Sequence, residues 1–377
     1  MKKNLFLFVC VLVFCNCTQK QKEGIIQVNL DDAQIINSNL FIDSIRYVKL
    51  ETTDLSIVSN IRKILMDDER IYILDNLSKI YVFDKEGKFQ YVIDKIGQGP
   101  EEYISASNIS LNRMHPWIEI LDLYSYKVFF YDVKNGDFID SYALIDFSYA
   151  IFPMENGFYL SNVPFFLEFP NGKEFGVNIL DSQFVRVKEL INYTSAYPTC
   201  GQDYGIFSEL EDGEYAVFSQ VEGAVYHLQD TIFKQKYCFE FKNRLKPKSF
   251  KGVESFGLSE NEMRGIVDLF FYKETNACIF SDVTNGQRTA SFLYLKETNQ
   301  IFVIGGFERN EHIIEPQLFV KSDTKNIIFS AVPVEPFIEG LKIYPDGPEG
   351  ADKEFVDFVK NSKFEDNPIL QIIYLKH

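Results

Sequence analysis

IYILDNLSKIYVFDKEGKFQYVIDKIGQGPEEY, residues 71–103, is the stretch that decides the fold. It holds three short runs rich in Ile, Tyr, Val and Phe, separated by turn residues and followed by a Gly-x-Gly-Pro corner. Such runs, bounded by Asp, Asn and Gly, are typical of β-strands joined by tight turns. Together with the apolar run 61–66 they predict a four-stranded sheet. One such sheet cannot bury its own faces, so the pattern predicts further copies along the chain.

Further copies of this blade pattern follow along the chain, and the later copies match the pattern less closely. Residues 118–122 and 127–132 repeat the middle pair of strands, and Asp84 and Asp132 are 48 positions apart. This spacing is close to the roughly 40–50 residues of a propeller blade. For the later copies we expect strands at 157–162, 176–181 and 184–190; at 214–220, 224–229 and 232–241; at 266–273, 277–282, 290–296 and 300–304; and at 313–320 and 326–332.

The sixth copy lacks outer strands, and the two ends of the chain can supply them. The run 369–375 is one candidate, and either 45–50 or 25–30 is the other. Pairing the chain ends in one blade closes the ring and removes an exposed sheet edge. We therefore predict an all-β fold, a six-bladed propeller whose ring is closed by N- and C-terminal strands. Short helices are expected only in inserts, at 259–267, 336–341 and 351–360.

The N-terminus predicts export. Lys2 and Lys3 precede an unbroken apolar run, 5–14, which is too short to span a bilayer and has the length of a signal-peptide core. A cysteine directly after such a run is typical of a bacterial lipoprotein, and polar residues follow Cys17 at once. Cys17 is therefore the predicted lipidation site, with Cys15 and an ordinary secretory signal as alternatives. The expected domains are a signal peptide at 1–16, a lipidated tether and N-terminal segment at 17–43, and one propeller at 44–377.

The net charge limits the expected binding partners, and the cysteine pattern limits the expected metal sites and disulfides. The formal net charge is −16, and removing Lys2 and Lys3 with the signal would bring it to about −18. Phosphate binding needs a basic footprint, so we expect no nucleic acid and membrane attachment through the lipid only. No C-x-x-C pair or zinc spacing occurs. Cys200, Cys238 and Cys278 are expected to be thiols, with one disulfide as the alternative.

The corner at 97–103 (GQGPEEY), preceded by VFDKEGKF at 82–89, resembles the six-bladed β-propeller lipoproteins of Bacteroidota, relatives of the NHL-type propellers. The entry strand 47–52 (YVKLET) and the exit segment 366–370 (DNPIL) are similar to those of the same family. The resemblance implies a single propeller carried by a lipid on the outer membrane. It does not imply a biochemical activity, because the family has none agreed. The lack of an acidic run after Cys17 favours the periplasmic face.

Several motifs have both a functional and a structural interpretation. Gly97, Gly99 and Pro100 could cradle a phosphate, but no helix or Lys-Ser/Thr follows, so a tight turn between blades is predicted. Glu102 and Tyr103 could face a ligand or cap that turn. Aromatic side chains in loops stack on sugars and on partner proteins, and also pack between blades. On these grounds the candidate binding residues are Glu102, Tyr103, Trp117, Phe165 and Phe166.

The remaining signals for chemistry are sparse. Asp75, Asp84, Asp122 and Asp132 could hold calcium in the channel, but Asp at a strand end usually accepts local backbone N–H groups. His227 lies in a predicted strand and is expected to be structural. No cofactor is predicted beyond that calcium alternative. Ser44 and Thr231 follow Asp and precede an apolar residue, which resembles the O-glycosylation sites of secreted Bacteroidota proteins.

These observations favour a monomeric, non-catalytic binding or scaffolding lipoprotein of the cell envelope. Its expected partner is a peptide, a glycan or an envelope protein, since a rigid ring with variable loops suits binding. The alternative is a metal-dependent hydrolase of the lactonase or lyase type that uses the central channel.

Overall fold

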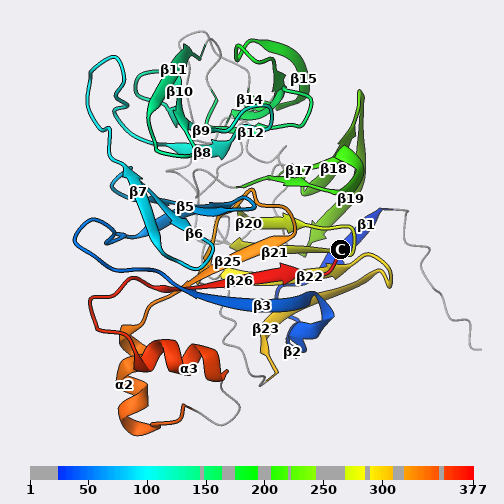
Figure 1. Ribbon diagram of the computed structural model, residues 1–377. Helices are drawn as coiled ribbons and strands as arrows, with labels where there is room; N and C mark the ends of the chain where they lie inside the picture. The colour runs from blue at the N-terminus through cyan, green and yellow to red at the C-terminus, as the bar shows by residue number, and fades with distance from the viewer. Residues whose placement is uncertain are drawn as a thin grey trace, which may run out of the picture.

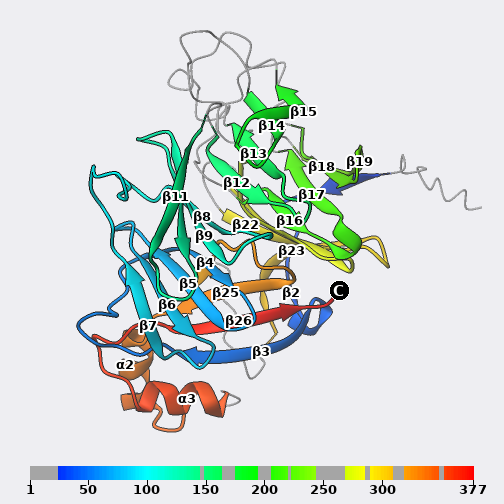
Figure 2. The same cartoon turned by 45° about the horizontal axis from the view of Figure 1, so that its top comes forward.

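The chain forms a ring of six sheets, each built on four antiparallel strands, which confirms the predicted six-bladed propeller (Figure 1, Figure 2). The computed structural model describes residues 24–144, 148–163, 175–193, 205–219, 222–242, 268–284, 289–308, 318–347 and 352–377. None of the helices in these ranges is long and apolar enough to cross a membrane.

Each blade is built on four strands, which in blades one to five run in sequence from the channel to the rim. Blades one to three contain β4 (Ile61–Met66), β5 (Arg70–Asp75), β6 (Ile80–Asp84) and β7 (Phe89–Ile93); β8 (Asn108–Leu111), β9 (Trp117–Asp122), β10 (Lys127–Asp132) and β11 (Phe138–Ala143); and β12 (Ala150–Pro153), β13 (Tyr159–Val163), β14 (Phe175–Leu180) and β15 (Arg186–Tyr193).

Blades four to six are built in the same way. They contain β16 (Phe207–Glu209), β17 (Tyr215–Ser219), β18 (Ala224–Gln229) and β19 (Ile232–Phe241); β20 (Asp268–Glu274), β21 (Cys278–Thr284), β22 (Thr289–Leu295) and β23 (Gln300–Phe307); and β24 (Phe319–Val320), β25 (Ile327–Val332), β26 (Ile369–Leu375) and β3 (Ile42–Lys49).

Blade six is closed by the two ends of the chain, as predicted. Strand β26 pairs antiparallel with β3, and Leu370 lies opposite Val48. Of the two expected partners, the run at 45–50 therefore takes this place. The other run forms β1 (Ile25–Val28), which pairs parallel with β19.

The N-terminal segment adds further strands to the ring. Besides β1, strand β2 (Ala33–Ile36) pairs parallel with β23, and a 3₁₀ turn, η1 (Ser38–Leu40), leads into β3. These strands cover the outer edges of blades four and five, which would otherwise present unpaired backbone groups. The expected domain boundary at residue 44 thus falls inside β3, and residues 25–36 belong to the propeller sheets.

The apolar core lies between neighbouring blades. Between blades one and two, Tyr72 and Val82 pack with Ile120 and Tyr131, and all four residues are fully buried. Burying such a side chain contributes about 1.5–3 kcal/mol, so the blades hold one another rather than folding singly.

The disc has two chemically different faces. The turns between strands one and two and between strands three and four lie on one face, which we call the hairpin face. The turns between strands two and three and the links between blades lie on the other, the link face. Helices α2 (Glu335–Ile343) and α3 (Lys353–Lys360) are inserted between β25 and β26 beside β3 (Figure 1), at two of the three expected inserts. The third, 259–267, lies outside the described residues.

Candidate functional site

A hollow of about 630 Å³ opens on the hairpin face at the mouth of the channel. It is bordered by turns of blades one, two and six and by the end of β12, and we call it the groove. Its lining combines acidic, basic and aromatic side chains. It includes Asp67, Asp68, Asn112, Arg113, His115, Trp117, Phe152, Asp323, Thr324 and Lys325.

The turn from Asn112 to Trp117 forms one wall of the groove. The Oδ1 atom of Asn112 accepts hydrogen bonds from the backbone N–H groups of Met114 and His115, both at 2.8 Å. The His115 ring stacks on Trp117 with centroids 4.2 Å apart, and the Trp117 ring meets the edge of Phe130. The turn is thereby fixed, with an exposed imidazole over a half-buried indole.

A buried carboxylate anchors this wall from below. Glu119 is 0 % exposed and accepts hydrogen bonds from Ser110 Oγ, Asn112 Nδ2 and Tyr159 OH, each at 2.6 Å. Burial raises the pKa of Glu119, and the three hydrogen bonds and the charge of Arg113 oppose that rise. The network ties the groove to the interior of blades two and three.

Ion pairs surround the channel mouth. Arg113 pairs with Glu209, and Lys325 Nζ lies 2.9 Å from Glu211 Oε2, in the 3₁₀ turn η2 (Glu211–Gly213). Because these charges come from different blades, the pairs set the shape of the mouth as well as its charge.

Deeper in the channel two lysines are buried. Lys63 Nζ pairs with Asp323 and donates to Asn108 Oδ1 at 3.0 Å. Lys273 Nζ donates to the carbonyl oxygens of Ser322 and Thr324, at 2.8 and 2.9 Å. Burial lowers the pKa of Lys273 to about 8.

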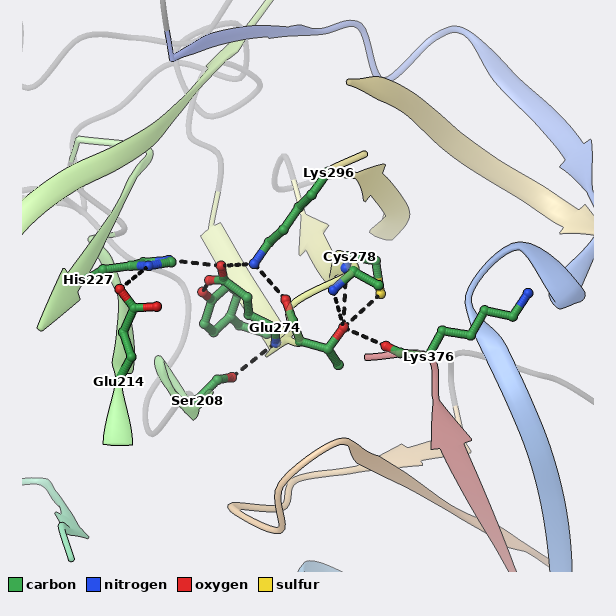
Figure 3. Close-up of polar contacts among 10 residues, drawn as sticks. Ser208, Glu214, His227, Glu274, Cys278, Lys296 and Lys376 are labelled. Atoms are coloured by element: carbon green, nitrogen blue, oxygen red, sulfur yellow. Dashed lines mark hydrogen bonds and ion pairs between the residues drawn. The ribbon is translucent and has the colours of Figure 1, made fainter. Parts of the chain in front are cut away.

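A second polar cluster lies between blades four and five (Figure 3). The Glu274 carboxylate is 0 % exposed and contacts His227 Nε2 at 2.9 Å, Lys296 Nζ at 2.6 Å and the Tyr272 hydroxyl. His227 Nδ1 lies 3.0 Å from Glu214 Oε1. Burial alone would raise the pKa of Glu274, but His227 and Lys296 outweigh it, so the pKa is lowered.

With no exposure at Glu274, this cluster can join blades but cannot receive a ligand as it stands. The groove, by contrast, is open and lined mainly by exposed and half-buried side chains. Among the described residues, no group of three or more His, Cys, Asp or Glu side chains is placed to hold a metal ion. The calcium alternative stays a prediction.

The structure places the predicted corner residues in a tight turn. Glu102 Oε2 accepts the backbone N–H of Gly99 at 2.9 Å, and a Cβ on Gly97 would lie 1.9 Å from that oxygen. Tyr103 is 0 % exposed, and its hydroxyl donates to the carbonyl oxygens of Ser78 and Ile93. Both side chains serve the turn and the core, so a ligand at the surface cannot reach the Tyr103 ring.

The other predicted site residues are spread over the molecule. Trp117 lines the groove, whereas Phe165, Phe166, Cys17 and Cys200 lie outside the described residues. Ser44 and Thr231 are exposed, on β3 and on the turn before β19. Cys278 is buried and Cys238 half-buried, and neither forms a disulfide within the described part of the chain.

Three central residues of these networks were not predicted: Glu119, Lys273 and Glu274. Their signal is a charged residue within or at the end of an otherwise apolar strand, WIEILD in β9 and DLFFYKE in β20. A buried charge requires partners, so such positions mark polar networks.

The model of the family DUF4934, a domain of unknown function, matches residues 24–374. The chain belongs to this family. The family match spans all six blades, in agreement with a single propeller.

One of the similar solved structures shares this fold. A "Putative exported protein" from Bacteroides fragilis NCTC 9343 is 18 % identical, with a TM-score of 0.74; the match covers 94 % of this chain and 100 % of that one. A member of the duf4221 family from Bacteroides vulgatus is 10 % identical, with a TM-score of 0.49 and coverage of 89 % and 97 %. No curated protein matches the chain.

Proposed function

We propose that this protein is a non-catalytic binding lipoprotein of the cell envelope, anchored to the outer membrane by acylated Cys17, and that it holds a glycan or peptide in the groove. The observation that carries the binding role is the groove itself. It presents a fixed His115–Trp117 stack next to paired charges at the open mouth of a rigid ring.

Aromatic rings beside hydrogen-bonding groups suit both sugars and peptide side chains. The turn at 112–117 is held by Asn112 and Glu119 before any ligand arrives, so little conformational entropy is lost on binding. An envelope location is supported by the apolar N-terminal run and by the similarity to the Bacteroides fragilis protein, which is named as an exported protein.

The groove is tested with the mature chain from residue 18 onward, without the acyl group. Ligands are first identified on an oligosaccharide array and in a peptide library, and their affinities are then measured by calorimetry. We expect Trp117→Ala to lower these affinities about tenfold. His115→Ala, at an exposed position, should weaken them with an unchanged melting temperature. Tyr344→Ala is the matched control, because Tyr344 is 61 % exposed on the helical insertion. Equal affinity of all variants would place the ligand elsewhere.

The anchor is tested by incorporation of labelled palmitate in cells. Wild type should incorporate label, and Cys17→Ala should not, while Cys15→Ala should retain it. The hydrolase alternative is examined in the same preparations, by adding lactones with and without calcium. Turnover that depends on calcium and is lost on chelation would replace the non-catalytic proposal.

A further inference from the structure

A second hollow, of about 470 Å³, opens on the hairpin face between blades three and four, which are neighbours in the ring (Figure 2). We call it the inter-blade pocket. It is bordered by the β12–β13 and β16–β17 turns near the channel, and by β14, β15 and the β18–β19 turn toward the rim. Its lining shares no residue with that of the groove, although the two meet at the end of β12, where Pro153 lines the groove and Met154 the pocket.

The floor of the inter-blade pocket is apolar and fixed. It is formed by buried side chains, Met154, Ile179, Tyr215 and Leu228. The Tyr215 hydroxyl accepts the backbone N–H of Glu155 at 2.9 Å, which holds the β12–β13 turn over the floor. Phe158 and Val187 line the open part of the pocket and are 38 and 53 % exposed. An apolar side chain placed against these two would remove their surface from water.

The charged side chains of the pocket are mostly acidic. Glu155, Asp212 and Asp230 line it, and all three are exposed. Among the lining residues, all of which the structure describes, Lys188 is the one cation, and its Nζ donates to the carbonyl oxygen of Thr231 at 3.1 Å. Three carboxylates therefore face one ammonium group, next to an apolar floor.

The two acids of η2 show how the pocket differs from the groove. Glu211 pairs with Lys325 at the channel mouth, where the charges of different blades compensate one another. Its neighbour Asp212 lines the pocket instead. Within the ranges that the structure describes, neither Asp212 nor Glu155 nor Asp230 forms an ion pair. The pocket thus keeps uncompensated negative charge at both its channel end and its rim end.

The charge selects a cationic occupant, and the spacing of the acids selects a peptide segment over a small cation. The turns that carry Asp212 and Asp230 are two strand spacings apart in blade four, which is about 10 Å. A single ammonium group does not span this distance. Three residues of extended chain do, at about 3.3 Å per residue, so two basic side chains on one segment can reach both ends while apolar side chains between them meet the floor.

We propose that the inter-blade pocket binds an extended segment of a partner protein in which two basic side chains flank apolar ones. The apolar side chains lie against Phe158 and Val187, and the basic ones pair with the acids at the two ends. The net charge of −16 adds long-range attraction for such a partner. The proposal does not rest on the ligand proposed for the groove, since the two linings are separate.

The test uses the mature chain from residue 18, made in cells that do not glycosylate it, because Thr231 also lines the pocket. The probe is a dansyl-labelled peptide, Gly-Gly-Lys-Leu-Phe-Lys-Gly-Gly. In one comparison peptide Glu replaces both Lys, and in another Ser replaces Leu and Phe. Fluorescence anisotropy at low salt measures the affinities. We expect the probe to bind at least tenfold more tightly than either comparison peptide, and its affinity to fall as salt is added.

Variants of the protein locate the site. Asp212→Asn/Asp230→Asn removes two charges and keeps both turns, because Asn tolerates the positive φ of these positions, +56° and +53°. We expect it to lower the affinity for the probe about tenfold. The matched control is Glu297→Gln/Glu335→Gln, which changes the net charge equally at exposed positions elsewhere and should bind like wild type. Phe158→Ser should weaken binding of the probe but not of the peptide that carries Ser.

The other outcomes overturn the proposal. Equal losses in the two double variants would mean that the net charge alone attracts the peptide. Equal affinity for the basic and the acidic peptide, or no binding of the probe at low salt, would reject a cationic occupant. Trp117→Ala should leave the affinity for the probe unchanged. A loss with Trp117→Ala and none with the pocket variants would assign the peptide to the groove, which rejects the pocket and supports the proposed function.

Discussion

Buried carboxylates toward the two faces of the propeller differ in the partners that compensate their charge. At the hairpin face, charges are paired across blades: Glu274 has three partners, and its pKa is lowered although it is fully buried. Toward the link face of blade five, burial raises the pKa of Asp282 to about 7. The hydrogen bond with the Ser291 hydroxyl opposes this rise but does not cancel it. Burial is common to both carboxylates, so the partners decide the sign of the shift.

This difference agrees with the surfaces above. The hairpin face offers fixed charges and an aromatic stack, which suits the recognition of a polar ligand. On the link face of blades one and two, Asp75 and Asp122 accept the backbone N–H groups of Leu77 and Tyr124, and the side chains of these two residues are exposed. The hairpin face also exposes apolar side chains, for example Phe158 on blade three and Ile232 on blade four.

The largest expected effect comes from removing the carboxylate that joins blades four and five. Glu274→Ala removes the carboxylate that contacts the buried His227 and the half-buried Lys296, and we expect a loss of about 3–5 kcal/mol in the free energy of unfolding. Urea denaturation at neutral pH measures it. The matched control is Glu211→Ala, which breaks the exposed pair with Lys325 and should change stability by about 1 kcal/mol or less. Similar small losses for both would mean that the buried network does not hold the blades.

The sequence predicted the strands of blade one to within one residue, because 61–93 alternates strongly and its turns carry Asp, Asn and Gly. It missed the innermost strands of blades two, three and four. These have three or four residues, and β8 and β16 contain Asn108, Ser110, Ser208 and Glu209. A short strand that turns polar side chains to a channel has no apolar period to detect.

The candidate site was predicted only in part, for a related reason. Trp117 stood out as a single tryptophan near a loop, and it lines the groove. Its support from Glu119 depends on Tyr159, 40 residues away in the next blade, and that pairing is set by the ring rather than by local sequence. Tyr103 shows the converse, since its loop position indicated a surface role that packing between blades takes away.

The next largest effect is a gain in stability on replacing Asp282, near the link-face end of blade five. Because the folded pKa of Asp282, about 7, exceeds the unfolded value of 3.8, the folded chain binds more protons between these values, and stability falls as pH rises. Asp282→Asn removes this dependence. Its stability relative to wild type should rise by roughly 3 kcal/mol between pH 5 and pH 8.

Urea denaturation of both proteins at the two pH values measures the gain. An unchanged difference between the proteins would show that Asp282 has a partner that stabilises its charge, and would remove the contrast with Glu274.

The smallest effect concerns the channel that connects the two faces. Lys273 has a folded pKa of about 8, below the unfolded value of 10.5, so the unfolded chain binds more protons between these values. Stability therefore rises with pH across this window, as the penalty for burying the charge is relieved. We expect wild type to gain about 2 kcal/mol relative to Lys273→Met between pH 7 and pH 9.5.

The difference between the two proteins isolates Lys273 from other groups that titrate in this range, because those groups are shared. If the two denaturation profiles run parallel from pH 7 to pH 9.5, the carbonyl oxygens of Ser322 and Thr324 and the nearby Asp323 stabilise the ammonium fully. The channel would then resemble the hairpin face, where buried charges are compensated. A diverging profile would place Lys273 with Asp282, as a charge that the ring buries at a cost.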